Sequence, residues 1–342
     1  MLRGVLDTAV GNGNHRLVSA SATNLVNLLR DSGRLSEALE VVNKKAEHTR
    51  RSGLGAWTEL ADQAQRLQIL AFMGEHEQVL AQTGQLRDQM ARLPARPAAN
   101  EPANSWNVRE GILGTGYYSG LTTGRWQLCL DLNAEVAASM RERDAGPYEL
   151  TKIRCNNAVP LIRLGRLAEA GGLLRECQQV FEEHRDIPAL ATVLSVRASL
   201  EAALGHRDAA ADLERTALRL SYARPDPRDI AVSHRHLASY LDARDRAGRR
   251  AHRLAAALIR TLTGIAEHLP STMQALAAEL TEDAGAAGLP GTVAEVIAVA
   301  EQTEGVRLGA LLDALEPDRQ VVEQILAEIL RDAAAGAGEG GG

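Results

Sequence analysis

Several residue groups in this chain come close to catalytic motifs, and each lacks a residue that the chemistry needs. His76 and Glu77 begin the zinc-protease pattern HExxH, but Leu80 occupies the position of the second metal-binding histidine. The segment from Gly114 to Gly120 is rich in glycine, yet its last glycine comes one residue too late for a dinucleotide-binding loop, and no strand is predicted before it. Its serine directly precedes Gly120, so the GxSxG nucleophile pattern is also missed.

Nucleotide and thiol chemistry have equally little support in the sequence. The phosphate-binding pattern GxxxxGK[ST] is absent. Cys155 stands beside Asn156 but has no base at a spacing that could activate it, and the spacing of Cys129, Cys155 and Cys177 matches neither a zinc knuckle nor a disulfide framework. We therefore expect a non-enzymatic protein without cofactor or metal, whose cysteines are small buried side chains in a reducing compartment.

A basic cluster lies between residues 234 and 253. Its arginines are Arg235, Arg244, Arg246, Arg249, Arg250 and Arg253, and its histidines are His234, His236 and His252. Such a cluster could bind nucleic acid or another acidic ligand. However, Asp242 and Asp245 interrupt it, no aromatic ladder accompanies it, and the chain has a formal charge of -6. A solvated helix face is the favoured interpretation, and we do not expect nucleic acid to be the partner.

The elements that must position these residues are marked by a recurring glycine that is followed five residues later by a small side chain. The pairs are Gly33/Ala38, Gly74/Val79, Gly124/Cys129, Gly165/Ala170 and Gly205/Ala210. The interval is about 40 residues with one longer gap, which is typical of a helical repeat array. The glycine supplies a tight turn between two helices, and the small residue lets the second helix approach the first. Apolar residues at helical spacing, with aromatic residues at 3%, predict an all-α fold.

These signals predict four segments. Residues 1–14 form an N-terminal helix or the end of a preceding repeat, and residues 15–262 form about six helix pairs with an inserted, proline-rich loop near 93–105. Residues 270–335 form a C-terminal helical cap, and residues 336–342 form a disordered glycine-rich tail.

Two further features complete this prediction. Pro160 lies inside a helical run, so we expect a kink or an early helix end there. The chain has neither an apolar leader nor an apolar run long enough to span a bilayer, so we expect a cytoplasmic protein without a membrane partner.

The chain resembles tetratricopeptide-repeat proteins of the variety with units of about 40 residues. The resemblance rests on the glycine and small-residue pairs and on segments such as 24–29 and 236–241, and it covers residues 15–262. It implies a right-handed α-α superhelix, followed here by the C-terminal cap, that binds a peptide or helix in a concave groove lined by the first helix of each pair. The usual aromatic positions of the family are mostly Leu or Ala in this chain.

The resemblance also assigns one set of residues to the groove. These candidate groove residues are Asn24, Asn27, Gln65, Gln68, Thr115, Tyr118, Lys152, Asn156, Ser199, His236 and Ser239. Amides and hydroxyls in a row can hydrogen-bond the backbone of an extended peptide without requiring a particular sequence, and Lys152 could bind a carboxylate. The alternative is that these are ordinary solvated positions of amphipathic helices.

The sequence therefore favours a protein–protein interaction scaffold that recognises a partner peptide or helix, as the sensor or adaptor arm of a signalling system. A first alternative is an oligomerisation or structural module, in which the amphipathic helix from Val321 to Leu330 pairs with a second copy. A second alternative is a nucleic-acid or small-ligand binder centred on the basic cluster.

Overall fold

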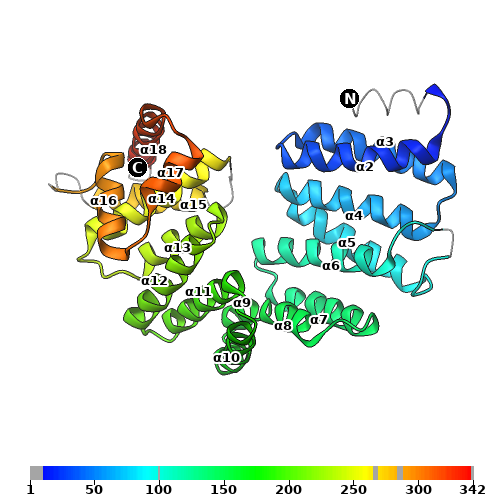
Figure 1. Cartoon of the computed structure of the whole chain (residues 1–342), viewed down its shortest axis with the longest axis horizontal. Helices are drawn as coiled ribbons and strands as arrows, with labels where there is room; N and C mark the ends of the chain where they lie inside the picture. The colour runs from blue at the N-terminus through cyan, green and yellow to red at the C-terminus, as the bar shows by residue number, and fades with distance from the viewer. Residues whose placement is uncertain (1–10, 99–100, 265–268, 283–287, 340–342) are drawn as a thin grey trace. The chain divides into compact units, whose positions relative to one another are not determined.

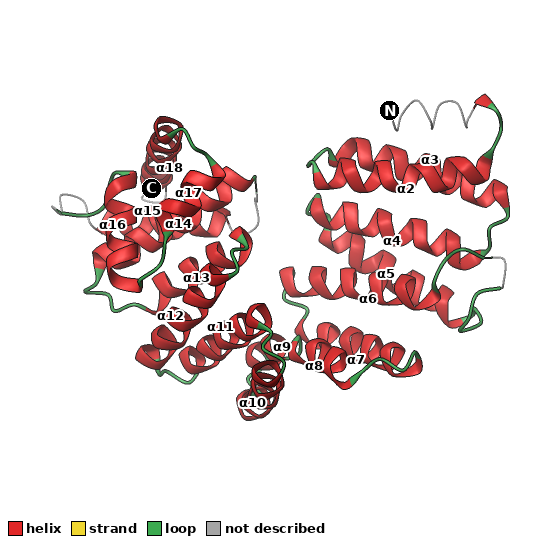
Figure 2. Cartoon of the chain, in the orientation of Figure 1, coloured by secondary structure: helices red, strands yellow, loops and turns green. Residues whose placement is uncertain are grey.

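The computed structural model describes residues 11–98, 101–264, 269–282 and 288–339, and the regular secondary structure in these ranges is α-helical throughout (Figures 1 and 2). The predicted all-α class is confirmed. The chain divides into two compact units, residues 1–165 and 166–342. Most of the predicted N-terminal segment lies outside the described residues, and the right-handed superhelix stays a prediction.

The first unit is a series of helices in which sequence neighbours pack together. Its helices are α2 (His15–Asp31), α3 (Leu35–Ser52), α4 (Ala56–Phe72), α5 (His76–Ala91), α6 (Ser105–Thr122), α7 (Trp126–Glu142), α8 (Pro147–Cys155) and α9 (Ala158–Arg163). The helix α4 contacts α3, α5 and α6. Its apolar face is therefore the centre of a core that includes Trp57, Leu60 and Leu67.

The glycine pattern produces the turns between paired helices. The five repeated glycines have φ between 72° and 88°, in the left-handed region that side chains with a Cβ rarely adopt. The small residues five positions later are all 0% exposed, namely Ala38, Val79, Cys129, Ala170 and Ala210. The pattern thus marks real turns between consecutive helices, each followed by a small residue that is fully buried.

The connection between α5 and α6, residues 92–104, is fixed to the start of α4 by side-chain hydrogen bonds. Trp57 Nε1 donates to the carbonyl of Pro94 at 3.0 Å. The carboxylate of Glu101 accepts from the backbone N–H of Thr58 at 2.9 Å, so it occupies a free donor in the first turn of α4. The loop is consequently anchored to α4 at Pro94 and at Glu101.

The helix interruption predicted at Pro160 is present. α8 ends at Cys155 and α9 begins at Ala158. Pro160 has no N–H to donate to the carbonyl of Asn156, four residues earlier. The hydroxyl of Tyr117 donates to that carbonyl instead, at 2.6 Å. A side chain of α6 therefore satisfies the acceptor that proline leaves free.

The second unit has at its centre a helix whose middle turns are fully buried. Its helices are α10 (Leu167–Glu183), α11 (Ile187–Ala203), α12 (Arg207–Ala223), α13 (Pro227–Tyr240), α14 (Arg246–Thr263), α15 (Leu269–Glu282), α16 (Val293–Glu304), α17 (Leu308–Leu315) and α18 (Arg319–Glu339). The helix α14 contacts α13, α15, α16, α17 and α18. Every residue from Leu254 to Arg260 is buried, because helices surround this segment.

The C-terminal helices carry both expected and unexpected features. Thr292 and Glu295 form a capping box at the start of α16, inside the predicted C-terminal helical cap. The predicted disordered tail is wrong in part, because α18 continues through residues 336–339. The alanines at 333–335 are strong helix formers and carry the helix onward.

In the described parts of the chain, none of the helices combines the length and apolar character that a membrane span requires.

Candidate binding pocket

Predicted groove residues of the first two repeats take part in hydrogen bonds between α2 and α4. Gln65 Nε2 on α4 donates to Asn27 Oδ1 on α2 at 3.3 Å. Arg30 Nη1 on α2 donates to Gln68 Oε1 on α4 at 2.9 Å. The amides of α4 are thus partly used to join one repeat to the next, which reduces what they offer to a ligand.

The remaining groove residues of the first unit have different environments. Thr115 is buried because α6 is packed against α4, α5 and α7. Its hydroxyl donates to the carbonyl of Gly111 at 2.8 Å. Tyr118 is exposed and meets the ring of His76 edge-on, with centroids 5.9 Å apart. Asn24, Lys152 and Asn156 are exposed.

In the second unit, the predicted groove residues join three helices. Ser199 Oγ on α11 and Tyr240 Oη on α13 are 3.0 Å apart. Ser195 Oγ lies 3.2 Å from His236 Nδ1 and donates to the buried carboxylate of Glu214 on α12 at 2.9 Å. Ser239 is exposed.

The group of Ser195, His236 and Glu214 has the residue types of a hydrolase triad but the wrong connections. In a triad the histidine lies between the serine and the acid. Here the serine hydroxyl faces the carboxylate directly. The second ring nitrogen of His236 accepts from Arg235 at 2.9 Å. The order of a triad is therefore absent, and the group forms a hydrogen-bonded contact between α11, α12 and α13.

The basic cluster does not form one cationic face. Arg249 and Arg253 both form ion pairs with the carboxylate of Glu279 on α15. His234 and His252 are fully buried. The other arginines divide into Arg244 and Arg246, which are exposed, and Arg235 and Arg250, which are half-buried. Helical periodicity distributes these residues around α13 and α14, so their closeness in sequence overstates the local charge.

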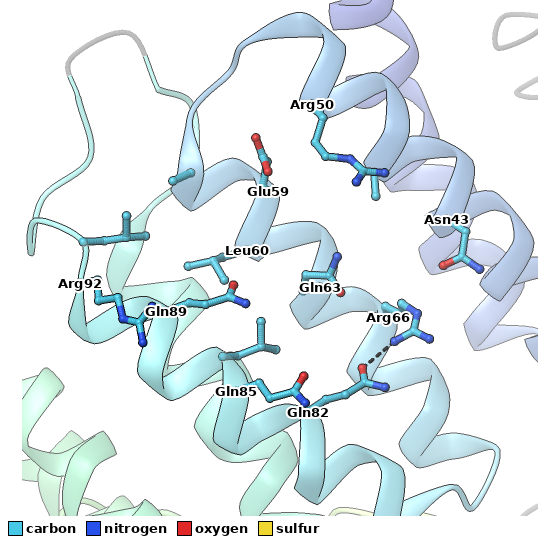
Figure 3. Close-up of a pocket in the computed structure, with 14 residues that line it drawn as sticks. Asn43, Arg50, Glu59, Leu60, Gln63, Arg66, Gln82, Gln85, Gln89 and Arg92 are labelled. Carbon is cyan, nitrogen blue, oxygen red and sulfur yellow. Dashed lines mark hydrogen bonds between the residues drawn. The ribbon is translucent and has the colours of Figure 1, made fainter.

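A polar pocket that the sequence did not indicate lies in the first unit. Its volume is about 810 Å³, and its walls come from α3, α4 and α5 (Figure 3). Each helix contributes residues three or four positions apart, which places them on one face. The polar lining residues are Asn43 and Arg50 from α3, Glu59, Gln63 and Arg66 from α4, Gln82, Gln85 and Gln89 from α5, and Arg92 directly after α5. Leu60 and Leu86, both buried, add apolar surface.

The pocket carries an excess of positive charge in an otherwise acidic chain. Three arginines and one glutamate line it, and the guanidinium groups surround Gln63 in Figure 3. Arg66 Nη1 donates to Gln82 Oε1 at 2.5 Å. Within the described residues, the side chains of Arg50 and Arg92 form no ion pair or hydrogen bond. Two guanidinium groups at the pocket are therefore free to bind an anionic group.

Sequence reasoning missed this pocket because it considered the first helix of each pair, whereas α3 and α5 are second helices. The available signal was the spacing of Gln82, Gln85 and Gln89, which places three amides on one helix face. Comparisons with known proteins add no information about this site, since neither a protein-family model nor a curated protein sequence matches the chain.

Proposed function

We propose that this chain is a non-catalytic protein–protein interaction scaffold whose α3–α4–α5 pocket binds an extended, acidic segment of a partner protein. The observation that carries this proposal is the combination of a concave site of about 810 Å³ with five side-chain amides and two unpaired guanidinium groups. We place the scaffold in the cytoplasm, as the sensor or adaptor arm of a signalling system. The three free cysteines agree with a reducing compartment.

The lining chemistry supports an extended peptide in particular. Side-chain amides both donate and accept, so they can pair with the N–H and C=O groups of a peptide backbone whatever its sequence. Arginine binds carboxylates through two parallel hydrogen bonds. Arg50 lies on α3, whereas Arg92 directly follows α5. A segment with acidic residues near both arginines would match this charge arrangement.

The pocket is a stronger candidate than the predicted groove. Gln65, Gln68, Ser199 and His236 already bond to neighbouring helices. By contrast, the amides of Asn43, Gln63, Gln85 and Gln89 have no side-chain hydrogen bonds within the described residues. Unused hydrogen-bond capacity at a concave site is what ligand recognition needs.

The oligomerisation alternative loses its main support. Val322, Leu326 and Ile329 on α18 are buried in the core of the second unit, where α18 packs on α14 and α15. The apolar face that would have paired with a second copy is therefore already covered within the chain.

The test is a binding titration with a fluorescein-labelled oligoglutamate peptide, followed by fluorescence anisotropy. We expect binding that weakens with salt and that is lost in the double variant Arg50→Glu/Arg92→Glu. Arg141→Glu is the matched control, because Arg141 is an exposed arginine of the same unit outside the pocket. Equal binding by the double variant and the control would refute the proposal.

A further inference from the structure

Four side chains from four helices of the second unit form a buried polar chain, which we call the His234–His252 cluster. The hydroxyl of Tyr222 on α12 lies 2.9 Å from His234 Nε2 on α13. His234 Nδ1 lies 2.8 Å from His252 Nδ1 on α14. His252 Nε2 lies 3.6 Å from Glu304 Oε1 on α16. Both histidines are 0% exposed and Glu304 is 1% exposed.

The short contact between the two imidazoles permits only one proton between them. Two nitrogens 2.8 Å apart form a hydrogen bond when one carries a proton and the other offers a lone pair. Because His252 also faces the carboxylate of Glu304, we assign the shared proton to His252 Nδ1, which donates to His234. His234 is then neutral, accepts at Nδ1 and carries its proton at Nε2, toward Tyr222.

The charged groups around the cluster favour this arrangement. From α12, Arg215 pairs with Glu304 at 3.3 Å, and Arg219 Nε donates to the Glu304 backbone carbonyl at 2.9 Å. Burial, and then the negative charge of Glu301 on α16, raise the pKa of the Tyr222 hydroxyl. From α13, His236 instead faces Ser195 of α11 and Glu214 of α12. Glu304 thus joins α16 to both α12 and α14, and among the described residues Arg215 and His252 are the partners of its carboxylate.

We propose that the His234–His252 cluster is an acid-sensitive junction. It holds α16, and α17 which follows it, against α12, α13 and α14, and protonation of His234 releases them. A proton on His234 Nδ1 would face the proton on His252 Nδ1, so the hydrogen bond would become a contact between two donors and two cations. The rings cannot turn toward water where they are, because both are fully buried. The junction must open for either ring to be solvated.

The direction of the pH effect follows from two depressed pKa values. Burial, reinforced by the charge of His252, holds the pKa of His234 well below 6.5. Burial alone would raise the pKa of Glu304, but His252 and Arg215 outweigh it and lower that pKa. Each of these groups therefore has a higher pKa, and binds protons more readily, in the unfolded chain than in the folded one. The stability that these two groups contribute is therefore fully present above about pH 6.5 and decreases as the pH falls, first through His234 and then through Glu304.

The test is amide hydrogen exchange of the full chain, measured by mass spectrometry at about pH 7.5 and about pH 5.5 and corrected for the intrinsic pH dependence of exchange. We expect exchange in residues 293–315 to accelerate by up to about tenfold at the lower pH, the most that one histidine can contribute over this interval, while α4 in the first unit serves as the internal reference. No selective acceleration in 293–315 would overturn the proposal.

Two variants identify the titrating group. His234→Gln keeps a donor and an acceptor but does not titrate in this range, so it should abolish the acceleration. His206→Gln removes an exposed histidine of the same unit and should leave the acceleration unchanged. An acceleration that persists in His234→Gln would refute the role of His234.

If His234→Gln fails to fold, histidine ring NMR of the unaltered chain decides the matter. We expect the His234 ring to carry its single proton on Nε2 at neutral pH and to titrate together with the change in exchange. Titration of His234 without any change in exchange of 293–315 would contradict the proposal.

Discussion

The Nζ of Lys45 lies 2.8 Å from Oδ1 of Asp62, and this buried ion pair joins α3 to α4, two of the helices that form the pocket. The two side chains are 6% and 0% exposed. Lys45 also donates to Gln65 at 2.5 Å, whereas Asp62 accepts no well-directed hydrogen bond within the described residues. The carboxylate is thus compensated by charge alone.

Removing one partner of this pair should be far more harmful than removing both. Asp62→Ala leaves the Lys45 charge buried, and we expect it to lower the free energy of unfolding by about 3 kcal/mol. The double variant Lys45→Met/Asp62→Leu should recover most of that loss, because apolar side chains need no compensation. Urea unfolding followed by tryptophan fluorescence measures both, since the three tryptophans all belong to the first unit. Asp88→Ala, at an exposed position of α5, is the control. A double variant as unstable as the single one would disprove this interpretation.

The hydroxyl of Tyr117 should stabilise the fold, because it donates to the carbonyl that Pro160 leaves without a backbone donor. Tyr117→Phe leaves the carbonyl of Asn156 without its donor, and we expect a loss of about 1 kcal/mol. In a Pro160→Ala background the residue at 160 regains an N–H for that carbonyl, so the same change should cost less. A double-mutant cycle by urea unfolding measures the coupling. Strict additivity would show that the two residues act independently.

Two glycines of the first unit should respond oppositely to alanine. A Cβ at either Gly33 or Gly114 meets open space, but only Gly33 has a positive φ, of 72°. Gly33→Ala should therefore destabilise the unit by about 1 kcal/mol, whereas Gly114→Ala, inside α6, should stabilise it by about 0.5 kcal/mol. Thermal unfolding of the two variants, compared with the unaltered chain, makes the measurement. Shifts of the same sign would contradict the turn assignment.

The cysteines should differ in reactivity. Cys129 is 0% exposed, and burial raises its pKa to about 11, so almost none of it is thiolate at neutral pH. Cys155 is half-buried and should be alkylated first. Brief treatment of the native chain with iodoacetamide, followed by peptide mass spectrometry, gives the order, and a denatured sample shows that all sites can react. Faster labelling of Cys129 than of Cys155 would be incompatible with this packing.

Local patterns could be predicted well from the sequence, because they depend only on the chain near each residue. The positive φ of Gly33, the burial of Ala38 and the interruption at Pro160 follow from spacing and from the chemistry of glycine and proline. The cap of α16 by Thr292 is equally local. Each of these features involves residues within one turn or one pair of helices.

Features that depend on which helices meet could not be predicted. The Lys45–Asp62 pair and the His234–His252 contact require the register between separate helices, and sequence spacing does not provide it. For the same reason, a polar residue such as Gln65 can bind a ligand or bridge two repeats, and the sequence does not distinguish these roles. The pocket was missed because its walls come from three helices that only packing brings together.

The most direct measurement for the central claim is photo-crosslinking of an oligoglutamate peptide that carries a benzophenone group, with the attachment sites mapped by mass spectrometry. We predict attachment to α3, α4 and α5 around Gln63, competed by unlabelled oligoglutamate and lost in Arg50→Glu/Arg92→Glu. Attachment around Asn24 and Tyr118, unaffected by that double variant, would contradict the claim and place the binding site on the first-helix face instead.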